Sequence, residues 1–308
     1  MFDTVEFYLL QEDHPHINFL KETSKHISVT SRGEGKFGRY VVGNHGGYKV
    51  IINNNRISFK KNSLARFRFG NNLKTLSRGD TKEVIQQIEE ELHCPVGKAH
   101  LTRLDLAQHF PMKHDSSLYF PLLGESQYYI RLEQPNGVTY QNSKKVKTFY
   151  NKSIENQEKK RPFPEIYQNS NLLRYEFRFM KRLPEQFNLP KVTLAMLYDE
   201  KFYFELVRTW RKEYLEIKKV SVNTTSLIPT GSTKYLVEQL AARTILNMGQ
   251  NQLFKTINEW HELNEISKKQ TFDLRKAIKN ICQAPDRYSG NELISELDKK
   301  VKDASRFC

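Results

Sequence analysis

The N-terminal part of the chain alternates apolar and polar residues in short runs, a period of two that is typical of half-buried β-strands. Glycines and the Asn53–Asn55 turn separate several of these runs and predict hairpins. Thr81–Leu92 instead repeats its apolar residues at helical spacing, and Asp80 or Thr81 is the expected N-cap. The expected strands are Asp3–Leu10, Arg39–Val42, Tyr48–Ile52, Arg56–Lys60, Arg66–Gly70, Leu101–Phe110, two within Val138–Tyr150 around the turn Asn142–Lys145, and Leu172–Met180.

From Leu194 the apolar spacing is helical almost to the end of the sequence. Ser221–Ser232 is rich in Thr, Ser and Pro and is the expected linker. The expected helices are Leu194–Leu215, Thr233–Leu246, Gln252–Leu263, Ser267–Cys282 and Asn291–Ala304. The pattern predicts an α+β domain over residues 1–220, with an antiparallel sheet and flanking helices, followed by a mostly helical region over residues 221–308.

Charge narrows the range of partners. The net charge of +14 and pI near 9.5 favour a polyanion, and therefore DNA or RNA. No basic amphipathic helix with a continuous apolar face and no apolar run of about 18 residues stands out, so a membrane partner is not expected. The first residues lack the basic and apolar regions of a signal peptide, which predicts a cytoplasmic protein. There is no GxxxxGK[ST] motif, so an ATP-driven motor is not expected.

Two of the predicted strands carry charge on one face. Alternation in Leu101–Phe110 places Arg103, Asp105 and His109 together. A carboxylate in an apolar strand needs a partner, so Asp105 either pairs with an arginine such as Arg103 or Arg178 or binds Mg²⁺ or Mn²⁺.

Leu172–Met180 has the same character, because Arg174, Glu176 and Arg178 share one face. These residues form either an ion-pair network or a metal-binding carboxylate between two phosphate-binding guanidiniums. The pattern alone favours neither interpretation.

Thr148–Glu155 contains a candidate nucleophile. Tyrosine can attack a phosphodiester and hold the cut strand as an ester, and a nearby cation favours its phenolate. Lys152 would lie on the same face of an extended strand as Tyr150 and supply that charge. With 15 tyrosines in the chain, this spacing alone is not specific. The surrounding basic residues, Lys144, Lys145, Lys147 and Lys159–Arg161, favour a DNA groove there.

Three segments occur together in a familiar order: Thr102–Ala107, Val138–Ser143 ending in Phe149–Glu155, and Asn171–Arg178. In this order and spacing they resemble the phage and plasmid replication initiators of the filamentous-phage gene II/X type. The resemblance extends from about Met1 to Val220.

The resemblance implies a rolling-circle initiator with a nicking domain like that of the HUH endonucleases, which cuts a single-stranded or hairpin origin. One strand would be held on a tyrosine by its 5′ end, and a free 3′ hydroxyl would be released for a host polymerase, with a host helicase as a second partner. Tyr150 matches the catalytic position and Tyr140 is the main rival. No small-molecule cofactor is implied beyond Mg²⁺ or Mn²⁺, for which Asp105 and Glu176 match the acidic motifs and His109 is a candidate third ligand. The expected DNA-binding residues are Arg103, Lys144, Lys145, Lys147, Arg174 and Arg178.

Two other functions fit the same charge. One is a non-catalytic basic DNA- or RNA-binding protein for copy control or packaging, which needs neither a metal nor Tyr150. The other is a mobilisation relaxase, which shares the tyrosine chemistry but serves transfer of DNA.

Overall fold

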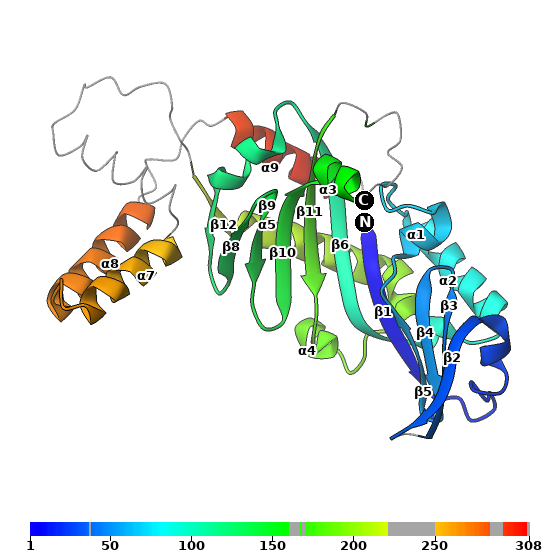
Figure 1. Ribbon diagram of the computed structural model, residues 1–308. Coiled ribbons are helices and arrows are strands. Elements are labelled where there is room, and N and C mark those ends of the chain that lie inside the picture. The colour runs from blue at the N-terminus through cyan, green and yellow to red at the C-terminus, as the bar shows by residue number, and fades with distance from the viewer. Residues whose placement is uncertain (37, 160–166, 168–169, 221–249, 284–291, 307–308) are drawn as a thin grey trace.

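The computed structural model describes residues 1–36, 38–159, 167, 170–220, 250–283 and 292–306 (Figure 1). Most of the described strands form one antiparallel ten-stranded sheet. Its strands, in spatial order, are β2 (Ser28–Gly35), β3 (Gly38–His45), β4 (Tyr48–Asn53), β5 (Arg56–Lys60), β1 (Phe2–Leu10), β6 (His100–Met112), β11 (Asn171–Phe179), β10 (Lys145–Asn151), β9 (Gly137–Gln141) and β8 (Ile130–Gln134). A small second sheet pairs β7 (Leu123–Ser126) with β12 (Ile217–Lys219).

Helices pack against this sheet, and helices also make up most of the described C-terminal part of the chain. The α-helices are α1 (Leu64–Phe69), α2 (Arg78–Leu92), α3 (Lys152–Glu158), α4 (Leu183–Phe187), α5 (Glu200–Leu215), α7 (Gln250–Glu262), α8 (Lys268–Gln283) and α9 (Glu292–Ala304). Short 3-10 helices are η1 (Thr23–His26), η2 (Val96–Lys98), η3 (Ser116–Leu118), η4 (Phe120–Leu122) and η6 (Leu194–Tyr198). The predicted α+β class is confirmed.

The main core lies between one face of the sheet and α2 and α5, which run behind the sheet in Figure 1. Phe149 of β10 stacks on Tyr175 of β11 at 4.4 Å between ring centroids, and Tyr175 stacks on Trp210 of α5 at 4.9 Å. Burying a ring such as Phe149 stabilises the fold by roughly 1.5–3 kcal/mol. This stack fixes the two strands against α5 and turns the alternate residues of each strand to the other face.

Alternation along β11 follows the prediction. Leu173, Tyr175 and Phe177 are buried in the core, and Arg174 and Glu176 lie on the opposite face. The register pairs Arg178 with Asp105, Glu176 with Ala107, and Arg174 with His109. The charged faces that were predicted separately for β6 and β11 therefore form one continuous surface.

Two local predictions within the first 100 residues were wrong. Arg66–Gly70 is not a strand, because the side chain of Ser63 accepts a hydrogen bond from the backbone of Arg66 and starts α1. Gly70 ends this helix in the left-handed conformation, with φ of 72°, where a side chain is disfavoured. Helix α2 begins before Thr81, since Ser77 and Asp80 form a reciprocal capping box and Ser77 is the N-cap.

The C-terminal helix α9 packs on the main core. Leu297 and Val301 are buried in the same apolar cluster as the sheet. Glu296 accepts a hydrogen bond from the Tyr119 hydroxyl at 2.6 Å, and Asp298 accepts one from the Tyr214 hydroxyl at 2.6 Å. Residues 292–304 therefore pack on the sheet domain, although they lie beyond the boundary expected at residue 220.

The other C-terminal helices form a hairpin with its own small core. Ile257 of α7 and Ile278 of α8 are buried together with neighbouring apolar side chains. The expected linker Ser221–Ser232 and helix Thr233–Leu246 lie outside the described residues. Within the described part of the chain, every helix is either too short or too polar to cross a bilayer.

Candidate active site

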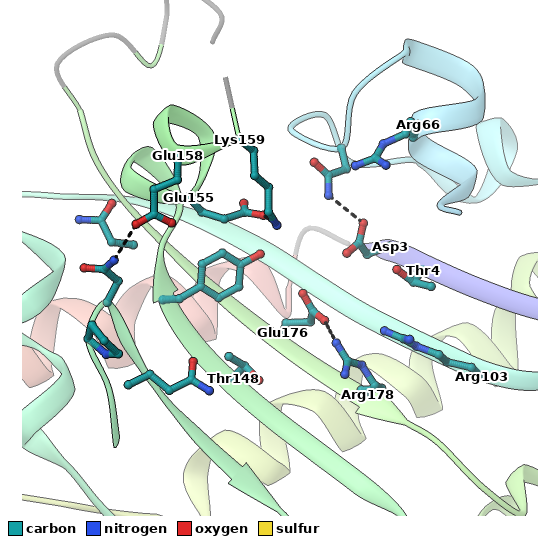
Figure 2. A pocket seen from close by; sticks show the side chains of 16 residues that line it. Asp3, Thr4, Arg66, Arg103, Thr148, Glu155, Glu158, Lys159, Glu176 and Arg178 are labelled. Carbon is teal, nitrogen blue, oxygen red and sulfur yellow. Dashed lines mark hydrogen bonds and ion pairs between the residues drawn. The ribbon is translucent and has the colours of Figure 1, made fainter. Parts of the chain in front are cut away.

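A pocket of about 660 Å³ opens on the sheet face opposite α2 and α5. Figure 2 shows Glu155, Glu158 and Lys159 on one wall and Asp3, Thr4 and Arg66 on the other. Glu176, Arg178 and Arg103 lie on the floor between these walls. The pocket therefore joins the start of β1, the middle strands β6 and β11, and the junction of β10 with α3.

Tyr150 lies near the end of β10 and lines the pocket with a half-buried side chain. Its direct cross-strand neighbours are Arg174 on β11 and Gly137 on β9. A Cβ at Gly137 would lie 2.2 Å from the carbonyl oxygen of Phe149 and 2.9 Å from Cβ of Tyr150, so only glycine fits there. Burial raises the pKa of Tyr150, and the Arg174 guanidinium opposes this rise.

Arg174 is the buried hub of the site, with a side chain only 1% exposed. Its guanidinium donates to the carboxylates of Asp3 and Glu176, the latter at 3.4 Å from Nε. Nη1 lies 2.7 Å from Nε2 of His109, which must be unprotonated to accept a hydrogen bond there. Burial, and then Arg174 and Lys152, lower the pKa of His109 well below its usual value.

Lys152 is not on an extended strand, because Asn151 caps α3 and Lys152 is the first residue of that helix. It still lies near the tyrosine, with Nζ 5.9 Å from the centre of the Tyr150 ring. Nζ donates to Glu155 at 2.5 Å, and Lys159 pairs with the same carboxylate. Burial opposes ionisation of Glu155, but these two lysines lower its pKa.

Asp105 is fully buried and paired with both arginines that the sequence suggested. It accepts from Nε and Nη2 of Arg103 at 2.9 and 2.5 Å, and from Nε of Arg178 at 3.0 Å. Arg178 also donates to Glu176 at 2.7 Å. Burial raises the pKa of Asp105 to about 7, against the opposing effect of the two guanidiniums. Of the two roles predicted for Asp105, the structure shows the pairing with arginines.

The three predicted metal ligands do not converge. Asp105 and His109 are four residues apart on β6, about 13 Å along a strand, which is too far for one ion to bind both. Each predicted ligand is also occupied by an arginine: Asp105 by Arg103 and Arg178, Glu176 by Arg174 and Arg178, and His109 by Arg174. Among the described residues, no group of three or more potential ligand side chains is placed to hold a metal ion. The three predicted ligands therefore do not fit a single cation.

The rival tyrosine and the basic turn lie elsewhere. Tyr140 is fully buried, and its hydroxyl donates to the carbonyl oxygens of Leu123 and Gly124, each at 2.7 Å. Lys147 is fully buried on the core side of β10, where Nζ lies 2.8 Å from a carboxylate oxygen of Glu213.

The remaining lysines of this turn are also directed away from the pocket. Lys145 pairs with Glu213 at 2.9 Å, on the same side of β10 as Lys147. Lys144, in the turn, is exposed and pairs with Glu185 at 3.3 Å. The buried Lys147 is thus placed away from the pocket, whereas Arg103 and Arg178 are partly exposed within it.

Sequence reasoning missed several residues of the pocket. Asp3 could have been found, because it is an acid within an apolar strand and follows the argument used for Asp105. Glu155 lies within the segment that suggested Tyr150, but its pairing with two lysines needs the helical turn of α3. Arg66 and Asn72 come from a region whose fold was mispredicted or unassigned.

The fold and pocket define a basic α+β protein whose open sheet face joins a tyrosine to a network of acids and arginines. The chain belongs to a phage family described as the N-terminal part of a replication-associated protein, whose profile matches residues 1–213. Comparison with curated proteins gives no match. The chain is therefore a replication initiator of the gene II type expected from its sequence, and the match covers the ten-stranded sheet, helices α1–α4 and all but the end of α5.

Proposed function

We propose that this protein starts rolling-circle replication by cutting one DNA strand with Tyr150. The observation that carries the proposal is the position of this tyrosine. Among the described residues that line the pocket, Tyr150 is the single tyrosine, and it stands directly across from the buried Arg174. Membership of a replication-associated family supports DNA as the substrate.

In the proposed reaction, the Tyr150 oxygen attacks the scissile phosphorus and forms a phosphotyrosine ester. The bond between phosphorus and the 3′ oxygen breaks, and the 5′ end of the cut strand stays on the protein. The phenolic proton leaves to solvent through the open pocket, and the departing 3′ oxygen takes up a proton to become a hydroxyl. Attack by a 3′ hydroxyl on the ester reverses these steps and rejoins the strand.

Arg174 is the residue best placed to favour the phenolate, because a buried positive charge beside a tyrosine stabilises its ionised form. Lys152 adds a second positive charge near the ring, although Glu155 is its direct partner. Arg103 and Arg178 are partly exposed on the pocket floor and are proposed to bind the phosphates of the strand.

The exposed 3′ hydroxyl would serve a host polymerase, with a host helicase to displace the strand. A Mg²⁺ or Mn²⁺ requirement also remains part of the proposal, although the predicted ligands do not form its site.

The test is covalent capture of DNA. Purified full-length protein is incubated with labelled single strands from its own replicon, with Mn²⁺ or with EDTA, and run on a denaturing protein gel. Wild type and Tyr140→Phe should form a labelled adduct in Mn²⁺, and Tyr150→Phe should form none. An adduct that survives Tyr150→Phe would reassign the nucleophile. Binding of DNA by wild type without an adduct on any strand would favour a non-catalytic binding protein.

A further inference from the structure

A second aromatic group lies on the pocket face of β1. Val5, Phe7 and Leu9 point into the core, so Thr4, Glu6 and Tyr8 share the opposite face. Thr4 lines the pocket, and Tyr8 lies four residues further, about 13 Å along the strand. The Tyr8 side chain is partly exposed there. A single strand that leaves the pocket along β1 would reach this ring.

The Tyr8 ring lies between two neighbours, which come from the strands on either side of β1. His100 of β6 stacks on it with 5.3 Å between ring centroids and 19° between planes. The Arg56 guanidinium of β5 lies 5.9 Å from the centre of the Tyr8 ring. The three side chains, here called the Tyr8 platform, come from three adjacent strands. Tyr8 thus supports the exposed Arg56 guanidinium from below, and a guanidinium backed by aromatic rings resembles the surfaces on which proteins stack nucleic acid bases.

The surface between the pocket and the Tyr8 platform can accept a phosphate backbone. Glu6 would repel it, but Nζ of Lys60 pairs with this carboxylate at 2.9 Å. Arg103 is the register partner of Glu6 and lines the pocket. Arg56 is exposed at the far end. Arg103 and Lys60 thus flank Glu6 midway along the path, from β6 and β5, and Arg56 lies at its far end, so that positive groups are available to a polyanionic strand.

We propose that the Tyr8 platform stacks an unpaired base of the DNA strand whose scissile phosphate lies in the pocket. The proposal rests on the function proposed above, and it adds a binding subsite a few nucleotides from the cut. Because every base has a flat face, this subsite contributes affinity for single-stranded DNA and little sequence preference. It favours a locally melted origin, since a base in a duplex is not free to stack on a protein ring.

The test compares two probes that share a backbone and differ in bases: a labelled deoxythymidine homopolymer and an abasic strand of equal length. Fluorescence anisotropy gives the affinity of the full chain for each. Tyr8→Ala should weaken binding of the homopolymer about tenfold, within the range for one stacked base, and leave the abasic strand unchanged. Tyr8→Phe keeps the ring and should bind as wild type does. Tyr128→Ala is the matched control, because this tyrosine is 84% exposed in the turn before β8.

An equal loss on both probes, or no loss on either, would overturn the proposal, as would failure of wild type to bind single-stranded DNA. Tyr8→Trp gives an independent readout, because its fluorescence should be quenched by the homopolymer and not by the abasic strand. The capture assay with Tyr150→Phe is scored separately. A base-dependent loss in Tyr8→Ala, in a protein that forms no adduct, supports the Tyr8 platform and rejects the nicking function.

Discussion

Tyr150 and Arg174 are direct cross-strand neighbours on β10 and β11, and the guanidinium is buried beneath the pocket that the tyrosine lines. The sequence suggested that this arginine would steady the strand, but its side chain is only 1% exposed and is not among those that line the pocket. Its charge acts instead on its neighbours, the Tyr150 hydroxyl and the carboxylates of Asp3 and Glu176. The same buried arginine therefore affects both the ionisation of Tyr150 and the stability of the fold.

Arg174→Gln should lower the free energy of unfolding by about 3–5 kcal/mol, because it leaves two carboxylates without their buried partner. Urea denaturation measures this loss. Arg68→Gln is the control, since Arg68 forms an exposed ion pair with Glu83 at 2.9 Å and its loss should cost no more than about 1 kcal/mol. Similar losses in both variants would show that Arg174 is not the hub described above.

Lys147 and Lys159 should differ in their effect on DNA binding. Lys159 lines the pocket with a half-exposed side chain, so Lys159→Gln should reduce the slope of log affinity against log salt by about 0.7, the value for one phosphate of a single strand. Lys147→Met removes a charge already held by Glu213 in the core, so the slope should not change. A shallower slope for Lys147→Met would restore the basic turn as a DNA contact.

His109 should make the protein less stable in mild acid. Burial keeps its folded-state pKa well below 6.5, whereas the unfolded chain takes up a proton near 6.5. Between these values the unfolded state binds more protons, so stability falls as pH drops below about 6.5, by up to about 1.4 kcal/mol per pH unit. Urea denaturation of His109→Gln from pH 7.5 to 5 should show a weaker fall than wild type. Equal profiles for wild type and His109→Gln would contradict the assignment.

Alternation was sufficient to predict the charged faces of the two middle strands. Arg174, Glu176 and Arg178 lie together because the intervening residues are apolar and enter the core. The same rule could have placed Lys147, which shares its side of β10 with Phe149 and not with Tyr150.

Pairings between distant segments were not accessible in this way. Asp3 meets Arg174 only because β1 and β11 both flank β6, and the start of α3 at Lys152 depends on the Asn151 cap. The three predicted metal ligands lie apart for a related reason. Residue type suggested three ligands, but strand spacing keeps two of them apart and nearby arginines occupy all three.

Helix α9 packs on the main core although it lies about 75 residues beyond the sheet domain in the sequence, a contact that the sequence pattern could not show. Leu297 is fully buried against the main core, whereas Leu263, in the turn between α7 and α8, is 68% exposed. Leu297→Ala should therefore destabilise the sheet domain by about 2–5 kcal/mol, the usual cost of a cavity left by a buried leucine, and Leu263→Ala should have little effect. Both are measured in a Trp260→Phe background, so that the fluorescence of Trp210, buried in the main core, reports on this domain alone. If Leu297→Ala left the Trp210 transition unchanged, α9 would have to be assigned to the C-terminal region and the domain boundary moved back to residue 220.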